Sequence, residues 1–187
     1  MEYKTLEQVD NNLNIVLVGM PGAGKSFIGK KLAKLLVQFS YIDTDAEIQN
    51  TAGMTITEIF EKHSEKYFRE LESNLIYEIS NHKNCIISIG GGAFENEENR
   101  RLLKKNSLVF YLKAPVDELY QRIENETHRP LLDNENPKQK LKTTLKRREK
   151  NFLKANFVIN TYKQPAYSIL DKIIGAYESY VRPQSIR

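Results

Sequence analysis

The sequence predicts an α/β protein built on a parallel sheet whose two faces are covered by helices. Short apolar runs alternate along the chain with longer amphipathic stretches, which is the pattern of strands separated by helices. The first apolar run, residues 15–18, leads through a glycine-rich turn into an amphipathic stretch, as a strand, a turn and a helix would. Ligands of such sheets bind at the carboxyl ends of the strands, so functional residues are expected there.

The same periodicity gives the individual elements. The expected strands are residues 13–18, 39–42, 85–89, 108–112 and 157–159. The expected helices are residues 25–37, 45–51, 57–63, 65–81, 97–104, 116–124, 137–151 and 167–180. Thr55 and Glu58 have the spacing of a capping box, which marks a helix start.

Length and composition limit the class of protein. A chain of 187 residues is long enough for one domain with a full core and short appendages, so we expect a single domain over residues 1–187. No apolar run reaches the roughly 18 residues that span a bilayer, and the polar, acidic N-terminus does not resemble a signal peptide. The one cysteine, Cys85, lies in an apolar run and is expected to be buried. These features favour a cytoplasmic protein.

The charge distribution argues against nucleic-acid binding. The formal net charge is +4, but the basic residues are scattered or interleaved with acidic ones, and no aromatic residues alternate with them. Most of these residues are expected on solvated helix faces. A modest positive excess also suits an enzyme that acts on anionic substrates.

Residues 19–26, GMPGAGKS, match the phosphate-binding pattern G-x-x-x-x-G-K-[ST]. Glycines allow consecutive backbone N–H groups to turn toward a phosphate, and the helix that follows adds its partial positive charge. Lys25 can then reach the β- and γ-phosphates, and the Ser26 hydroxyl can bind Mg²⁺. A glycine-rich turn without a ligand is the alternative.

Two further strand ends carry polar or glycine-rich sequences. The second strand runs into Asp43 and Asp45, and the third runs into Gly90, Gly91 and Gly92. Taken alone, the aspartates are more typical of a helix cap and the glycines of a flexible turn. Their joint position beside a phosphate loop instead favours a site that holds a metal-side carboxylate, a second carboxylate and a close backbone approach to a ligand.

Two arginine groupings complete the candidate site. Arg69 and Glu72 share one face of a helix, where a surface ion pair is the plain alternative. Arg129 lies in a polar segment, residues 124–136, which is typical of a mobile flap. An arginine in such a flap can reach a transferring phosphoryl group.

With these motifs in this order and spacing, residues 14–180 resemble a shikimate kinase. The resemblance rests on residues 19–26, Asp43 with Asp45, Phe68-Arg69-x-x-Glu72, residues 90–92 and Arg129-Pro-Leu-Leu132. It implies a P-loop fold of three α/β/α layers, related to the nucleoside monophosphate kinases, with a five-stranded parallel sheet in the order 2-3-1-4-5. It also implies a substrate-binding segment near residues 45–72 and a mobile lid near 124–136, while residues 1–12 form an N-terminal extension.

The resemblance also assigns roles to individual residues. It implies catalytic roles for Lys25, Asp45 and Arg129, and places Ser26 and Asp43 on the metal. It implies that ATP contacts Gly22, Ala23, Gly24, Lys25, Ser26, Phe27, Arg122 and Arg129. It implies that the substrate contacts Asp45, Arg69, Glu72, Gly90, Gly91, Gly92 and Arg147. The family element Arg-x-Pro-Leu-Tyr is reduced here to its arginine, and counting back from residues 155–161 favours Arg147, with Arg148 as the neighbouring alternative.

The function implied is transfer of the γ-phosphoryl group of ATP to the 3-hydroxyl of shikimate in aromatic amino-acid biosynthesis, with Mg²⁺ as cofactor. ATP and shikimate are the expected small-molecule partners of a monomer that binds neither nucleic acid nor membrane. Two alternatives stay open at this point. One is a kinase for a related small polyol acid such as gluconate, and the other is a nucleotide-binding regulatory module that lacks catalysis.

Overall fold

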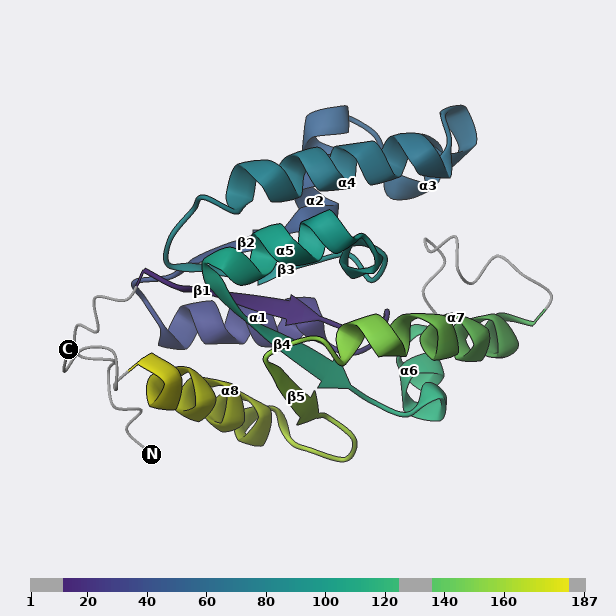
Figure 1. Cartoon of the computed structure of the whole chain (residues 1–187). Coiled ribbons are helices and arrows are strands. Elements are labelled where there is room, and N and C mark those ends of the chain that lie inside the picture. Colours follow the sequence, from purple (N-terminus) through teal and green to yellow (C-terminus); the bar gives the residue numbers. More distant parts are fainter. Residues whose placement is uncertain (1–11, 125–135, 182–187) are drawn as a thin grey trace.

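A computed structural model of the chain describes residues 12–124 and 136–181. Its strands form one five-stranded sheet in the order β2-β3-β1-β4-β5, and every neighbouring pair is parallel (Figure 1). The strands are β1 (Asn14–Val18), β2 (Ser40–Asp43), β3 (Cys85–Ser88), β4 (Ser107–Lys113) and β5 (Phe157–Asn160). The predicted fold class and strand order are therefore confirmed.

Helices connect consecutive strands and cover both faces of the sheet. They are α1 (Lys25–Leu35), α2 (Thr44–Ala52), α3 (Ile56–Lys62), α4 (Glu65–Ile79), α5 (Glu97–Lys105), α6 (Val116–Ile123), α7 (Pro137–Phe152) and α8 (Ala166–Val181), with a short 3₁₀ helix, η1 (Ala93–Glu95). Figure 1 shows α1 and α8 on one face of the sheet and α4 and α5 on the other. Because both faces are covered, the central strands β1, β3 and β4 carry near-continuous apolar runs rather than an alternation of apolar and polar residues.

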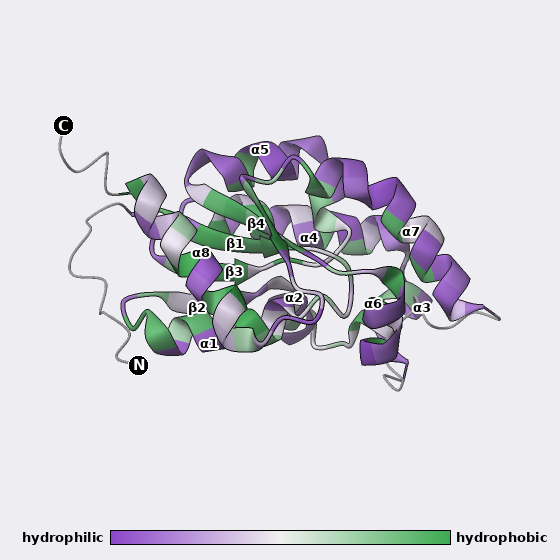
Figure 2. Cartoon of the chain, turned by 90° about the horizontal axis from the view of Figure 1, so that it is seen from below, coloured by the Kyte–Doolittle hydropathy of each residue, from purple (hydrophilic) through white to green (hydrophobic). Residues whose placement is uncertain are grey.

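Burial follows from this layering. All five residues of β1 are buried, as are six of the seven residues of β4. Figure 2 shows the central strands as hydrophobic and the outer helices α5 and α7 as largely hydrophilic. The Cys85 thiol is buried at the start of β3, as its apolar run predicts, and burial raises its pKa. No helix in the described ranges is both long and apolar enough to cross a membrane.

A second, smaller hydrophobic cluster lies apart from the main core. It consists of Ile48 on α2, Ile59 on α3 and Phe68 on α4, all buried. These three residues fall in the segment 45–72 that the resemblance associates with the substrate. The capping box expected at Thr55 and Glu58 is present at the start of α3, with the Glu58 amide donating to the Thr55 hydroxyl.

Differences from the predicted elements are confined to their ends and to one short helix. The helix expected over residues 25–37 ends at Leu35, because Leu36 leaves helical dihedral angles and Val37 is exposed. The helix expected over residues 65–81 ends at Ile79. The helix η1 was not expected, since three residues are too few to show a period. The expected N-terminal extension lies outside the described residues up to Asn11, and the expected lid does so over residues 125–135.

Candidate active site

The phosphate loop lies at the carboxyl end of β1 and leads directly into α1. Gly22 and Gly24 have φ angles of 79° and 87°, which lie in a backbone region that residues other than glycine rarely adopt. A Cβ on Gly22 would also lie 2.6 Å from the carbonyl oxygen of Leu119. Lys25 Nζ donates to the carbonyl oxygens of Gly19 and Met20, at 3.1 and 3.2 Å, so the ammonium lies against the loop.

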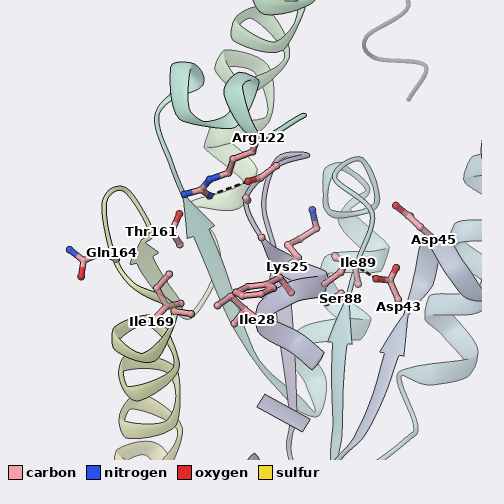
Figure 3. A pocket seen from close by; sticks show the side chains of 16 residues that line it. Lys25, Ile28, Asp43, Asp45, Ser88, Ile89, Arg122, Thr161, Gln164 and Ile169 are labelled. Carbon is pink, nitrogen blue, oxygen red and sulfur yellow. Dashed lines mark hydrogen bonds between the residues drawn. The ribbon is translucent and has the colours of Figure 1, made fainter. Parts of the chain in front are cut away.

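The loop forms one wall of a cavity of about 470 Å³ (Figure 3). The lining contains every described residue that was predicted to contact ATP or metal: Gly22, Ala23, Gly24, Lys25, Ser26, Phe27, Asp43 and Arg122. Asp45 also lines this cavity. Thr161 and Gln164, which follow β5, line it too, and Figure 3 shows them on the side of Arg122, away from Asp45. The ends of several strands therefore meet around one space, as expected for a parallel sheet.

Asp43, which lines this cavity, accepts hydrogen bonds from two hydroxyl groups. Ser26 Oγ donates to Asp43 Oδ2 at 2.7 Å, and the Tyr41 hydroxyl donates to the same oxygen at 3.0 Å. Tyr41 also lies 3.2 Å from Ser88 Oγ, and burial, with Asp43 nearby, raises its pKa to about 12. The serine hydroxyl and carboxylate thus sit together as oxygen ligands that suit Mg²⁺.

Arg122 ties α6 to the phosphate loop. Its guanidinium donates to the carbonyl oxygen of Gly22 at 3.1 Å and to Glu118 Oε1 at 2.8 Å. It lies at the opposite end of the cavity from Asp43 (Figure 3). The predicted flap arginine, Arg129, lies outside the described residues, so its role stays a prediction.

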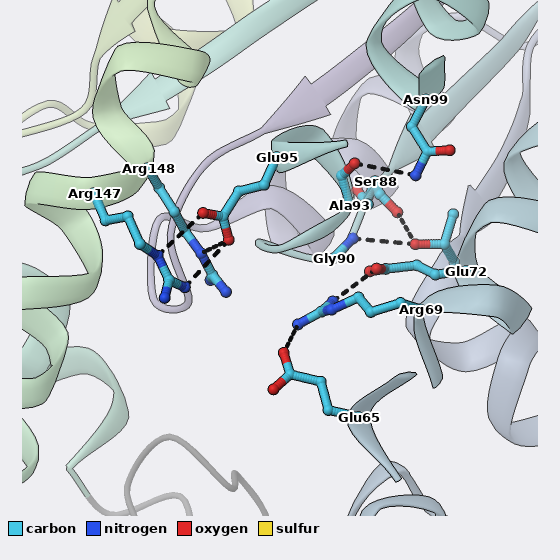
Figure 4. A network of polar contacts seen from close by, with 11 residues as sticks. Glu65, Arg69, Glu72, Ser88, Gly90, Ala93, Glu95, Asn99, Arg147 and Arg148 are labelled. Carbon is cyan, nitrogen blue, oxygen red and sulfur yellow. Dashed lines mark hydrogen bonds and ion pairs between the residues drawn. The ribbon is translucent and has the colours of Figure 1, made fainter. Parts of the chain in front are cut away.

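A second group of charged residues lies on the other side of Asp45. Arg69 NH1 donates to Glu72 Oε2 at 2.7 Å, and NH2 donates to Glu65 at 3.0 Å (Figure 4). The Glu72 side chain is only 1% exposed, so this is not the surface ion pair that the spacing alone would suggest. Burial raises the pKa of Glu72, Arg69 opposes that rise, and the charge of Asp45 adds to it.

The three glycines after β3 let these groups come close together. A Cβ on Gly90 would lie 2.6 Å from Glu72 Oε1 and 2.7 Å from Asp45 Oδ1. A Cβ on Gly92 would overlap the guanidinium of Arg69. At Gly90 and Gly92, charged side chains therefore pack directly against the backbone, a crowding that a merely flexible turn would not show.

Two adjacent arginines on α7 face the same turn in different ways. Arg148 is buried, and its NH1 would lie 3.3 Å from a Cβ on Gly91. Arg147 has a side chain 63% exposed and points outward. Both pair with Glu95, through Arg148 Nε at 2.8 Å and Arg147 Nε at 3.1 Å. Of the two, Arg148 is the arginine whose side chain faces the turn, while the binding of the substrate carboxylate by Arg147, the residue chosen by counting along the sequence, stays a prediction.

The position of Arg148 on the buried face of α7 explains why it points inward and Arg147 does not. This position could have been inferred from the spacing of apolar residues in the sequence. Leu141 and Phe152 are buried and bring one face of α7 onto the core, where Phe152 stacks on Tyr111 at a centroid distance of 5.0 Å. Arg148 follows Leu141 by seven residues and precedes Phe152 by four, so it lies on the buried face. We call Arg69, Arg147 and Arg148 the arginine cluster. Burial lowers the pKa of the Arg148 guanidinium and Glu95 opposes this, but an arginine stays charged.

Several residues of this region were missed by the sequence reasoning. Thr161 could have been suspected, because it follows a strand that ends at the same sheet edge. Tyr41 lies inside a strand, and Glu95 lies in a short helix without periodicity, so neither carries a sequence signal. Asp45 belongs to both regions, since it lines the phosphate-loop cavity and also faces Glu72 across Gly90.

Comparison with known proteins bears directly on this arrangement. The family model "Shikimate kinase" matches residues 21–178. The chain is 37% identical over 181 residues to a shikimate kinase of Bartonella henselae, covering 97% of this chain and 85% of that protein. It is 39% identical over 165 residues to a shikimate kinase of Thermodesulfovibrio yellowstonii, covering 88% of this chain and 95% of the other.

A solved structure gives the same result in three dimensions. The shikimate kinase from Acinetobacter baumannii, determined in complex with shikimate, superposes with a TM-score of 0.86 at 39% sequence identity. The match covers 90% of this chain and 94% of that one. The family model covers most of the chain, and the matches span 85% or more of each of these relatives. The chain therefore belongs to the shikimate kinase family.

Proposed function

We propose that this protein transfers the γ-phosphoryl group of ATP to the 3-hydroxyl of shikimate, as a step of aromatic amino-acid biosynthesis. Membership of the family supports the reaction. The observation that carries it in this chain is the position of Asp45 between the phosphate-loop cavity and the arginine cluster. An acceptor held by the arginines would present a hydroxyl beside Asp45, facing the phosphate loop.

The acceptor side suits a small cyclic acid with several hydroxyls. Arg69 and Arg148 are the candidates for the substrate carboxylate, because a planar guanidinium can hold a carboxylate with two hydrogen bonds. Glu72 Oε1 is buried without a hydrogen-bond partner among the described residues, and it faces Gly90. It can accept a hydrogen bond from a substrate hydroxyl. The backbone of residues 90–92 would line the ring.

The reacting hydroxyl is assigned to Asp45. A carboxylate at the attacking oxygen can accept or orient its proton, which typically contributes about 10²–10⁴-fold to the rate. Asp45 belongs to the first turn of α2, so its backbone is fixed by the helix rather than by a loop. The rest of the reaction depends on positioning and charge stabilisation, as is usual for phosphoryl transfer.

The donor side would bind ATP through the phosphate loop. Backbone N–H groups of residues 22–26 and the ammonium of Lys25 would contact the phosphates, and Arg122 would lie beside the base. Ser26 and Asp43 fit Mg²⁺, since their oxygens already lie 2.7 Å apart at the loop. When bound there, Mg²⁺ neutralises phosphate charge. Arg129 is proposed to contact the transferring group from the lid.

We also infer that the protein works as a cytoplasmic monomer with ATP and shikimate as its partners. The buried Cys85 thiol is compatible with a reducing compartment.

One experiment decides between the proposed function and its alternatives. Purified protein is given Mg-ATP and an equimolar mixture of shikimate, quinate, gluconate and nucleoside monophosphates, and the products are identified by mass spectrometry and ³¹P NMR. We expect shikimate 3-phosphate as the single dominant product. Phosphogluconate would instead support the polyol-acid kinase, and ATP binding without any product would support the regulatory module.

A further inference from the structure

We propose that Glu95 is a positioning residue for the substrate carboxylate: it holds Arg148 by one edge so that the other edge faces the acceptor. The proposal rests on the function proposed above. The part that Glu95 plays in the site follows from the polar contacts drawn in Figure 4.

The hydrogen bonds of the Arg148 guanidinium involve only one of its three nitrogen atoms among the described residues. Glu95 Oε2 accepts from Nε of Arg148 at 2.8 Å. Among the described residues, none hydrogen-bonds NH1 or NH2 of that guanidinium, and NH1 lies on the side of Gly91. When a guanidinium is held through Nε, its NH1 and NH2 groups are still able to donate two hydrogen bonds to a second carboxylate. The bond to Glu95 therefore sets the direction in which Arg148 presents its free donors.

The negative charge of Glu95 is balanced by a second arginine. A carboxylate beside an anion-binding arginine would normally weaken the site by repulsion. Here the other oxygen of Glu95 is paired with Arg147, at 3.1 Å to Nε, with NH2 3.3 Å from Oε2. Two guanidinium groups thus share one carboxylate, and the three residues together keep a positive charge. Arg147 offsets the charge of Glu95, which explains why two adjacent arginines occur at this point of α7.

Glu95 itself is held by hydrogen bonds to its backbone. It ends η1, directly after residues 90–92, and its backbone N–H donates to the Gly92 carbonyl oxygen at 2.9 Å. The buried Arg100 of α5 donates to the carbonyl oxygens of Phe94 and Glu95, at 2.8 and 2.7 Å. The residue that orients Arg148 is therefore held next to residues 90–92, the glycines that line the proposed acceptor site.

The experiment compares Glu95→Ala with Glu98→Ala by calorimetric titration. Glu98 is a matched control, because it lies three residues further on and pairs only with the exposed Arg101 in the described structure. We expect Glu95→Ala to weaken the binding of shikimate about tenfold, the size of a lost charge-assisted contact, with the Kd for ADP unchanged. Glu98→Ala should leave both constants unchanged.

The sign of the effect separates orientation from charge. If Glu95 acted only as a nearby negative charge, its removal would tighten the binding of shikimate. A Kd that is unchanged or lower in Glu95→Ala overturns the proposal. Glu95→Gln, which keeps an acceptor for Nε, should recover part of the affinity, and it also tests the proposal if the alanine variant folds poorly.

A substrate analogue gives a second readout. The methyl ester of shikimate has no carboxylate for Arg148 to bind, so Glu95→Ala and the unaltered protein should bind it equally weakly. An equal loss for ester and acid would mean that Glu95 only supports the fold, which contradicts the proposal. If the unaltered protein failed to bind shikimate at all, the proposed function would fail together with this inference. Normal binding with an insensitive Glu95→Ala variant would overturn the inference alone.

Discussion

The phosphate-binding residues of this site come mainly from one short stretch of chain, whereas the acceptor-binding residues come from four separated elements. Residues 19–26 form their loop through local backbone geometry and a helix start. The acceptor side instead needs α2, α4, the turn after β3 and α7 to meet. The comparison indicates that a local motif specifies how a phosphate is held, while the packing of distant elements specifies which acceptor is held.

The two sides also differ in how their charges are stabilised. Lys25 is held by carbonyl oxygens of its own loop, and Ser26 by the neighbouring Asp43. The arginine cluster is held by carboxylates, of which Glu72 is buried and Glu95 is shared by two guanidinium groups. Removing one member of a buried charged group leaves the rest without a partner, so the acceptor side should be more sensitive to single substitutions than the phosphate loop.

The largest expected effect is at the residue that joins the two sides. Asp45→Asn keeps the size of the side chain but loses the charge that orients the acceptor hydroxyl. Turnover should fall by about 10²–10⁴-fold, while the Kd for Mg-ATP stays near that of the unaltered protein. Steady-state kinetics and nucleotide titration measure the two quantities.

Asp43→Asn is the control for Asp45→Asn. Because Asp43 is assigned to the metal, this change should raise the Mg²⁺ concentration needed for half-maximal activity. Near-normal turnover in Asp45→Asn would mean that this carboxylate is only part of the start of α2, and the two sides would not meet there.

Next in size is the difference between the two arginines of α7. Arg148→Ala removes the buried guanidinium and leaves Glu95 facing the site, so the Kd for shikimate should rise by about 10–100-fold. Arg147→Ala removes a side chain that is 63% exposed, and a change of about threefold or less is expected. The reverse order would restore Arg147 as the carboxylate ligand. Calorimetric titration of both variants makes the comparison.

A smaller effect is expected from adding one methyl group beside Arg69. Gly92→Ala places a Cβ on the guanidinium, which must move away from Glu72, and the KM for shikimate should rise about tenfold with the KM for ATP unchanged. Gly175→Ala on α8 is the matched control, since a Cβ there has open space and alanine favours the helix. Equal kinetics for the two variants would show that residues 90–92 do not need to be glycine.

The smallest effect concerns the phosphate side. Burial raises the pKa of Tyr41 to about 12, so between pH 10 and 12 the unfolded chain loses this proton while the folded chain keeps it. The stabilisation is therefore present below pH 10 and is lost as the pH rises toward 12. The free energy of unfolding, measured in urea at pH 9 and at pH 11, should fall less between these two pH values for Tyr41→Phe than for the unaltered protein.

Tyr180→Phe, a change at an exposed tyrosine, should behave like the unaltered protein in the same measurement. Tyr41→Phe should also raise the Mg²⁺ requirement slightly, because Asp43 loses one hydrogen bond. If Tyr41→Phe and Tyr180→Phe lost stability equally with pH, the hydroxyl of Tyr41 would not be the buried group that the contacts with Asp43 and Ser88 indicate.

The sequence was sufficient for the architecture because the fold depends on patterns that extend over whole elements. The five apolar runs and the connecting helices were predicted from these patterns, and β1 leads into the phosphate loop as expected. The strand order was predicted from the resemblance to the shikimate kinases and not from the patterns. The turn at residues 90–92 was placed at the correct strand end. Its glycines, however, needed the structure to explain them, since the side chains that crowd them come from α2, α4 and α7.

The acceptor side was less predictable because its contacts depend on helix phase and on short elements. Counting back from β5 placed Arg147 in the site, but the anchoring of Leu141 and Phe152 turns Arg148 inward. Glu95 could not be found from periodicity, because η1 has three residues and its partners are more than 50 positions away. Tyr41 looks like an ordinary strand residue until Asp43 and Ser88 are seen beside it.

The small hydrophobic cluster of Ile48, Ile59 and Phe68 has a consequence for how such an enzyme changes over evolution. Because these residues pack among α2, α3 and α4, the helices that carry Asp45, Arg69 and Glu72 have a core of their own. We expect substitutions in that core to shift the acceptor-binding side chains more than the sheet and the phosphate loop. Such changes would alter the choice of acceptor more than the use of ATP.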